Sequence, residues 1–197
     1  MQPFFRTVYF LPSVISISVV GLLFQLVYHP SIGLLNQGLR GIGLGGLCHA
    51  WLGEKNTAIF AIIATSQWQY MGYIMLLFLV AIQKIPQELY EAAEIDGCGR
   101  LQTMRRVILP IMRPSIVSVG LYAFINAWNE FMFGYIFISQ DRFRTITPAI
   151  MLFKGANSID WGGLMAASVI AVLPVAFVFL FLQRFFMAGM MSGAVKG

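Results

Sequence analysis

The sequence predicts an all-α integral membrane protein with about four transmembrane helices. Of its 197 residues, 58% are hydrophobic and only 11% are charged, and the mean hydropathy is +0.77. Such a chain has too little polar surface to be covered by water on all sides. Its apolar residues form long runs, and about 20 such residues suffice for an α-helix to cross a bilayer. The runs are too long and too continuous for the strands of a membrane barrel.

The apolar runs define the spans and the loops between them. We predict spans at about residues 8–28, 57–83, 107–138 and 162–186 of one transmembrane domain, residues 1–197. Pro12 predicts a bend near the start of the first span, and Pro174 predicts a kink in the fourth. The glycine-rich loop 30–53 is expected to contain a short surface helix at Leu34 to Leu39.

The basic residues predict the orientation of the spans. Eight of the 13 Lys and Arg residues lie near the termini, in the loop 84–106 or at the start of the third span. The positive-inside rule therefore places both termini and that loop in the cytoplasm. Basic residues that flank spans also account for the net charge of +5, so no nucleic-acid partner is expected. Cys48 and Cys98 then face opposite sides, which excludes a disulfide, and neither has metal-ligand spacing.

The cytoplasmic loop contains the densest cluster of charge, "PQELYEAAEIDGCGRLQTMRRVILP", from Pro86 to Pro110. Pro86 suits the first turn of a helix, and Glu88 suits its positive end. Gly97 can adopt the left-handed conformation that ends a helix. We therefore predict two short helices joined by a sharp turn. From the residues alone, two interpretations stay open: a solvated loop that holds basic charges, or a helix pair that docks into a groove of a partner.

The spacing within this loop resembles the cytoplasmic signature of bacterial ABC-importer permeases. That signature is Glu-Ala-Ala, three residues, Gly, nine residues, and Ile-x-Leu-Pro, and the one departure here is Val107 in place of Ile. In that family the loop is a coupling helix that sits in a cleft of the ATPase subunit. The resemblance thus implies that ATPase coupling involves Glu91, Ala92, Ala93, Asp96, Gly97, Leu109 and Pro110.

The resemblance extends along nearly the whole chain and is to carbohydrate-type permeases of the maltose and glycerol-phosphate transporter kind. "FFRTVYFLPSVIS" and "PSIGLLNQGL" look like the first of two partner permeases, whereas "NAWNEFMFGYIFIS" and "WGGLMAASVIAVLPV" look like the second. This leaves open which place the chain takes in a heterodimer. Family members usually have two further spans upstream, so the resemblance implies that two N-terminal spans are missing here.

The resemblance implies a non-enzymatic subunit, in the bacterial inner membrane, of an ATP-driven importer for a sugar or related polyol. The expected partners are cytoplasmic ATPase subunits, a second permease subunit, an extracytoplasmic substrate-binding protein and membrane lipid. The sequence has no G-x-x-x-x-G-K-[ST] phosphate loop, so ATP would be bound by a partner, and we expect neither a cofactor nor a metal here. The alternatives are a secondary transporter or channel and an intramembrane enzyme, although no H-E-x-x-H or G-x-S-x-G motif is present.

Polar side chains inside the spans are candidates for the substrate pathway, because they are costly in hydrocarbon unless they face the bundle interior or a watery cavity. Glu130 is the only acidic residue within a predicted span. The alternative is that these groups only form hydrogen bonds between helices. The candidates are Asn126, Trp128, Asn129 and Glu130, and more weakly Gln67, Trp68 and Tyr73.

Overall fold

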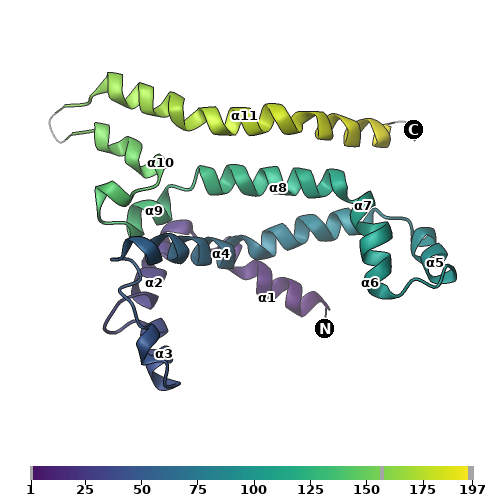
Figure 1. Ribbon diagram of the computed structural model, residues 1–197, viewed down its shortest axis with the longest axis horizontal. Helices are drawn as coiled ribbons and strands as arrows, with labels where there is room; N and C mark the ends of the chain where they lie inside the picture. Colours follow the sequence, from purple (N-terminus) through teal and green to yellow (C-terminus); the bar gives the residue numbers. More distant parts are fainter. Residues whose placement is uncertain (1, 156–157, 195–197) are drawn as a thin grey trace. The chain divides into compact units, whose positions relative to one another are not determined.

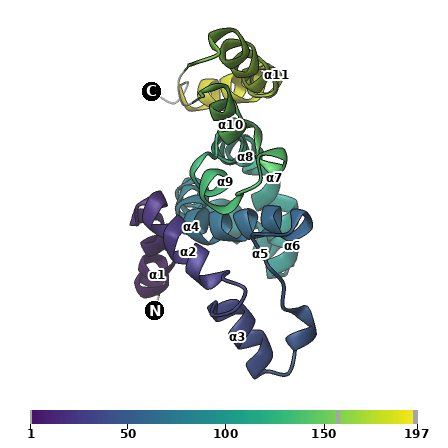
Figure 2. The ribbon, with the colours of Figure 1, turned by 90° about the vertical axis from the view of Figure 1, so that its left-hand side faces the viewer.

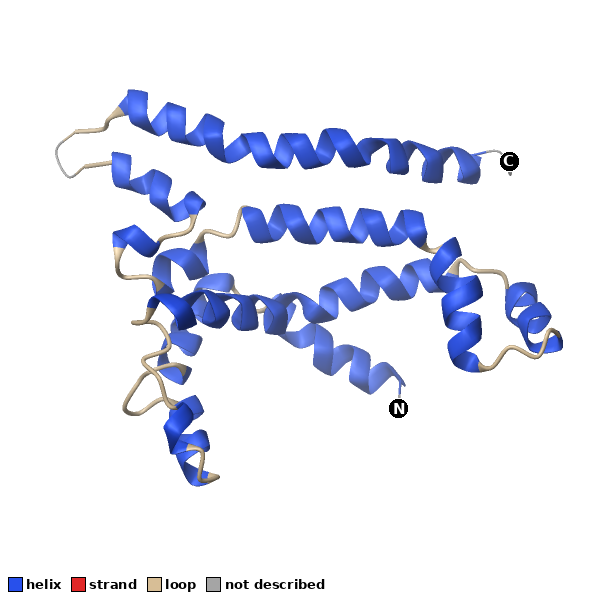
Figure 3. Ribbon diagram, viewed as in Figure 1, coloured by secondary structure: helices blue, strands red, loops and turns tan. Residues whose placement is uncertain are grey.

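The computed structural model describes residues 2–155 and 158–194 and consists of helices joined by loops (Figure 3). Within those residues the only β pairing is one isolated bridge between Lys154 and Ile159. The prediction of an all-α fold is therefore confirmed. Figure 1 gives the order and the labels of the helices along the chain.

The chain forms two units. The first contains Met1–Gly72 and Ala127–Leu173, and the second contains Tyr73–Asn126 and Pro174–Gly197. The helices α4 (Lys55–Gln83), α8 (Arg113–Trp128) and α11 (Trp161–Ala194) each contribute residues to both units.

The first predicted span is two helices rather than one. The helices α1 (Gln2–Val14) and α2 (Ile17–Val27) meet at an angle of 95°. The break is at Ser16, which has φ −55° and ψ 132° and is therefore not helical. It lies beyond Pro12, where the sequence predicted the bend. The buried amide of Gln69 in α4 donates to the Ile15 carbonyl at 3.0 Å and so satisfies a backbone group exposed by the break.

The core of the first unit lies where α2 meets α9 (Met132–Phe137) and the first half of α4. Phe133 and Phe137 are almost fully buried there, and Tyr28 packs edge-on against Phe137 with ring centroids 5.9 Å apart. Gly21 allows close approach, because a Cβ at that position would collide with the Ile136 side chain. These contacts fix α2, α4 and α9 against one another.

The glycine-rich loop leads from α2 to α4. It contains α3 (Leu34–Gly41), which confirms the predicted short helix, and η1 (Gly45–Leu47), which is one turn of 3-10 helix. Figure 2 shows α3 and the loop that returns from it to α4.

The third predicted span is also interrupted. The chain runs through a π-helical turn η2 (Met104–Ile108), then α7 (Leu109–Ile111), α8 and α9. Pro110 has no N–H to donate to the fourth residue before it, and in this stretch Leu109 donates to Met104 in π-helical register. Pro114 follows the bend of 74° between the two halves. The stretch predicted as the third span, about 107–138, is therefore a broken helix, and it remains a prediction that this stretch crosses the membrane once.

The second unit has a smaller core. Ile85, Ile108 and Met112 are buried, and Phe78 and Tyr90 pack against them. This core joins the end of α4 to α5 (Gln87–Ile95), η2 and the start of α8. The short helix α6 (Arg100–Thr103) leads directly into η2.

The remaining chain of the first unit forms short helices before α11. These are η3 (Asp141–Phe143), α10 (Ile146–Ala149) and η4 (Ile150–Phe153). By length and apolarity alone, one described helix, Trp161–Gln183, could cross a membrane, and up to four crossings result if each of three bent helix pairs counts as one.

Candidate functional site

The turn between α5 and α6 is a Schellman motif, centred on Gly97. The Cys98 N–H donates to the Ala93 carbonyl at 2.9 Å, and the Gly97 N–H donates to the Glu94 carbonyl at 3.0 Å. Gly97 has φ +74°, which confirms the predicted left-handed turn. A Cβ at Gly97 would meet open space, so the requirement for glycine comes from the backbone conformation and not from crowding.

The helix α5 is anchored on its inner side, and α6 is held by hydrogen bonds at its start. Ala93 is only 4% exposed, and Tyr90 packs on the core of the second unit. At the start of α6, the Gln102 side chain accepts the Gly99 N–H at 3.2 Å and the Thr103 hydroxyl donates to the Gly99 carbonyl at 3.3 Å. These bonds limit the freedom of the turn, so the segment holds a defined shape.

The outer side of the same segment presents apolar side chains. Ile95 is 86% exposed and Leu101 is 81% exposed, one at each end of the Gly97 turn. The candidate coupling residues Glu91, Ala92, Asp96 and Gly97 are also exposed, Leu109 is 43% exposed and Pro110 is half-buried. Sequence analysis did not single out Ile95, although an isoleucine immediately after a Glu-Ala-Ala-Glu run on a solvated helix was a visible signal.

The polar cluster of the third predicted span lies where that span breaks. The helix α8 ends at Trp128, and α9 begins at Met132. The Glu130 carboxylate accepts the backbone N–H of Phe133 at 2.6 Å and that of Gly134 at 2.9 Å. Glu130 thus caps the N-terminus of α9, where a negative charge is favourable.

Two other members of the cluster bind backbone carbonyls. The Asn126 amide donates to the Tyr122 carbonyl of its own helix at 2.8 Å, and the Trp128 indole donates to the Ala171 carbonyl of α11 at 2.9 Å. The Thr147 hydroxyl donates to the Trp128 carbonyl at 3.0 Å. Trp128 therefore joins α8, α10 and α11 within the first unit, and Asn129 is exposed.

A small cavity brings two of the candidates together. It has a volume of about 160 Å³, and Gln67 and Glu130 both line it, together with Ser66 and Thr145. The Thr145 hydroxyl is buried without a hydrogen-bond partner. Trp68 and Tyr73 lie elsewhere: Trp68 packs on Phe24 with ring centroids 5.1 Å apart, and Tyr73 packs on Tyr122 at 5.3 Å in the second unit.

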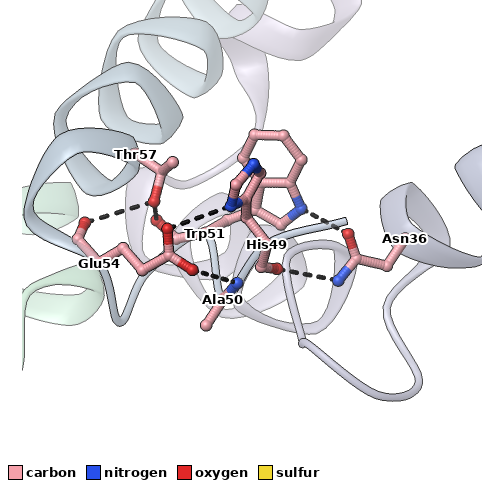
Figure 4. Close-up of polar contacts among 6 residues, drawn as sticks. All are labelled: Asn36, His49, Ala50, Trp51, Glu54 and Thr57. Carbon is pink, nitrogen blue, oxygen red and sulfur yellow. Dashed lines mark hydrogen bonds and ion pairs between the residues drawn. The ribbon is translucent and has the colours of Figure 1, made fainter. Parts of the chain in front are cut away.

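The glycine-rich loop is held by a hydrogen-bond network that sequence analysis missed (Figure 4). Asn36 is 1% exposed, and its amide donates to the carbonyls of Pro30 at 3.0 Å and His49 at 2.9 Å. Its side-chain oxygen accepts the Trp51 indole N–H at 2.7 Å. Glu54 accepts the Ala50 N–H at 3.1 Å, and its other oxygen lies 3.2 Å from the His49 imidazole.

No group of three or more His, Cys, Asp or Glu side chains that could hold a metal occurs among residues 2–155 and 158–194. Cys48 and Cys98 are both free thiols.

Comparison with known proteins gives several curated relatives of similar sequence. The chain is 40% identical over 190 residues to the probable ABC transporter permease protein YurN of Bacillus subtilis, covering 95% of this chain and 65% of the relative. It is 38% identical to the trehalose/maltose transport system permease protein MalG of Thermococcus litoralis, covering 75% and 52%. It is 34% identical to the diacetylchitobiose uptake system permease protein NgcF of Streptomyces coelicolor, covering 98% and 55%. The chain thus spans about half to two thirds of the length of these relatives.

Solved structures have a similar fold. A bacterial ABC transporter that imports the polysaccharide alginate aligns with a TM-score of 0.78 at 24% identity, covering 93% of this chain and 66% of that one. The same kind of transporter in complex with a pentasaccharide-bound periplasmic protein aligns with a TM-score of 0.81 at 24% identity, covering 93% and 64%. The family described as "Binding-protein-dependent transport system inner membrane component" matches residues 1–192. The chain therefore belongs to this family of ABC-transporter permease subunits, which are membrane components and not enzymes.

Proposed function

We propose that this chain is the translocating part of an ATP-driven importer for a sugar or related polyol, and that it receives the work of ATP hydrolysis through the α5–Gly97–α6 segment. The observation that carries the coupling role is the shape of this segment. A fixed Schellman turn holds Ile95 and Leu101 outward, and the inner side of the segment is packed on the core that continues into α4 and α8. A partner that moved the segment would therefore move these two helices.

The proposed coupling residues divide into two roles. Glu91, Ala92, Asp96 and Gly97 are exposed and can touch the ATPase, with Ile95 and Leu101 as apolar anchors. Ala93 faces inward, and Leu109 and Pro110 lie at the π-helical join, so these three transmit position. Exposed aliphatic side chains beside a rigid turn are the kind of group that fills a groove in a partner.

For the substrate pathway we propose the cavity beside Gln67 and Glu130. A carboxylate, an amide and two hydroxyl groups converge there among isoleucine side chains, which suits a ligand with several hydroxyl groups. Trp128 contributes by holding the end of α8 against α10 and α11, and the exposed Asn126 and Asn129 remain candidates for contact with the substrate. Trp68 and Tyr73 act as packing residues in this proposal.

The proposed assembly contains two ATPase subunits, a second permease subunit and an external binding protein. Four membrane spans agree with the upper count of crossings, in which each of the three bent helix pairs is one crossing beside Trp161–Gln183. In this proposal α5 and α6 are the cytoplasmic parts of two of those pairs, and the basic residues support a cytoplasmic position for both termini. A sugar-sized pathway near the midplane of such transporters generally lies between two related halves, and this chain supplies one. The names of the relatives support carbohydrate as the substrate class.

Co-purification with the ATPase subunit tests this function. We expect Ile95→Asp and Leu101→Asp to reduce the ATPase recovered with the full-length permease, because each places a charge in an apolar contact. Ile42→Asp is the matched control, since Ile42 is 71% exposed in the glycine-rich loop, outside the segment. Undiminished recovery in the Ile95→Asp, Leu101→Asp double variant would contradict the coupling role.

A further inference from the structure

A second cavity lies in the first unit, between the end of α2, the start of α4 and the chain that follows α9. Its volume is about 290 Å³, and it shares no lining residue with the cavity beside Gln67. In the proposed topology it opens on the outer side of the membrane. Its lining includes Tyr28, His29, Glu54, Ser139, Gln140 and Phe143. We call it the outer pocket.

The floor of the outer pocket is part of the buried core of the first unit. Tyr28, Ala58 and Ile138 are at most 6% exposed and belong to the core of the first unit. The Tyr28 hydroxyl is already engaged, since it donates to the Ala61 carbonyl and accepts the Thr65 hydroxyl, each at 3.3 Å. Tyr28 therefore offers ring surface to the pocket, as Phe143 does. Hydrogen bonds to a ligand would come from the side chains on the rim.

His29 supplies a directed donor on the rim. Its Nδ1 accepts the backbone N–H groups of both Ser31 and Ile32, each at 3.3 Å. A ring nitrogen that accepts hydrogen bonds carries no hydrogen, so the hydrogen of the neutral imidazole is on Nε2. That Nε2–H has no partner in the described part of the chain and can donate to a ligand.

Glu54 supplies acceptors on the same rim, and Figure 4 shows the contacts that hold its carboxylate. Its two oxygens are oriented by the Ala50 N–H and the His49 imidazole, and a carboxylate has about four acceptor sites, so about two remain. Gln140 completes the set. Its oxygen accepts the Arg142 Nε–H at 3.2 Å, which leaves its amide hydrogens without a partner among the described residues.

We propose that the outer pocket binds one neutral sugar or polyol unit, whose hydroxyl groups donate to Glu54 and accept from His29 and Gln140 while its carbon skeleton lies against Tyr28 and Phe143. A volume of 290 Å³ is at the small end of ligand pockets, which suits one ring-sized unit. This inference rests on the proposed transport of a sugar or polyol, and it adds a binding site at the outer entrance.

The charge of the rim decides the class of ligand. Among the side chains that the structure describes, Glu54 is the only acidic or basic one, histidine aside, that lines the outer pocket, and Arg142 lies outside the lining with its guanidinium 4.5 Å from the Phe143 ring centroid. An anionic sugar would meet the Glu54 carboxylate at close range, which is unfavourable. A neutral polyol can both donate to the carboxylate and accept from the imidazole and the amide.

Ligand protection of a thiol tests the site in the full-length protein, reconstituted in vesicles with its partner subunits. Ser139→Cys, with Cys48→Ser and Cys98→Ser, places one thiol on the exposed part of the lining. The maleimide labelling rate is measured with D-glucose, maltose, D-mannitol or D-glucuronate, in the absence of binding protein. When a neutral compound is present at a concentration of about four times its Kd, it should slow the labelling of the thiol about fivefold.

Substitutions in the lining identify which side chains are required for protection of the thiol. His29→Asn keeps an acceptor for the loop N–H groups but removes the Nε2–H donor, and Glu54→Gln removes the charge; both should abolish protection. Gln37→Ala is the matched control, because Gln37 is exposed on α3 outside the lining, and protection should persist. Protection by D-glucuronate as strong as by any neutral compound would overturn the proposed charge selection.

Two results would overturn the site itself. One is an unchanged labelling rate with every neutral compound. The other is protection by unliganded binding protein alone, which would mean that the outer pocket receives a protein side chain. ATP-driven uptake in the same vesicles tests the transport function separately. Uptake without protection of the thiol would refute ligand binding in the outer pocket but would still support the proposed transport function.

Discussion

The Glu130 carboxylate and the Gly134 backbone N–H are joined by a hydrogen bond of 2.9 Å across the start of α9. The same carboxylate accepts the Phe133 N–H at 2.6 Å. An acidic residue in an apolar stretch is thus explained by the break in the helix: the chain stops being helical after Trp128, and Glu130 satisfies two donors of the next helix.

Glu130→Ala should destabilise the protein by about 1–3 kcal/mol, because two backbone donors lose their acceptor in a poorly solvated place. Glu130→Gln should cost less, since its amide oxygen can still accept one of them. Thermal unfolding of the purified protein in lipid nanodiscs measures both. Equal stability of the alanine variant and the original protein would show that the cap is not required.

Gly134→Ala should cost about 1–3 kcal/mol through overpacking. A Cβ at Gly134 would lie 2.6 Å from the Thr145 hydroxyl oxygen and 2.9 Å from the Pro148 side chain. Gly120→Ala in α8 is the control, because a Cβ there meets nothing within 4 Å. Alanine is the better helix former, so this control should be neutral or stabilising. The reverse order of the two variants in thermal unfolding would contradict the packing described.

Gly97→Val should uncouple transport from ATP hydrolysis while the protein still inserts into the membrane. A side chain at φ +74° costs roughly 1–2 kcal/mol, and valine would displace α6 from its position. Gly99→Val is the comparison, since its φ of −67° and ψ of 163° suit valine, and it should be the milder variant. Substrate-stimulated ATPase activity of the reconstituted assembly measures both, and a normal value for Gly97→Val would be evidence against the coupling role.

Asn36→Ala should be strongly destabilising, by at least about 1–3 kcal/mol, because it leaves the Trp51 indole N–H and two carbonyls without their partner. Gln37→Ala, at the exposed neighbouring position, should be nearly neutral. A double-mutant cycle of Asn36→Ala with Trp51→Phe isolates the bond between them. Strict additivity in that cycle would mean that the 2.7 Å contact contributes nothing.

The features that the sequence predicted correctly are local ones. Gly97 ends α5 in the left-handed conformation, and α3 spans Leu34–Gly41 where a short helix was expected. Each depends on neighbours a few residues away: a glycine after a helical run, or a short periodic stretch between turn residues. Apolar length likewise identified the all-helical class.

The features that the sequence did not predict depend on partners far along the chain. At the break beside Ser16, the Ile15 carbonyl accepts a hydrogen bond from the Gln69 amide, which lies 54 positions along the chain. The Trp51 indole can donate to Asn36 only when the loop between them is folded. Apolarity cannot reveal such breaks, because a continuous helix and two helices at 95° have the same composition. Glu130 was visible in the sequence, but its role as a cap required knowing that α8 ends at Trp128.

Sugar uptake into vesicles tests the central claim most directly. The full-length protein is reconstituted with its partner permease, ATPase subunits and binding protein, and labelled sugar is measured inside the vesicles with ATP supplied on the ATPase side. The account predicts uptake that requires hydrolysable ATP and the binding protein, that persists when proton and sodium gradients are collapsed, and that falls sharply with Gly97→Val. Uptake that follows an ion gradient without ATP would contradict it and would indicate a secondary transporter.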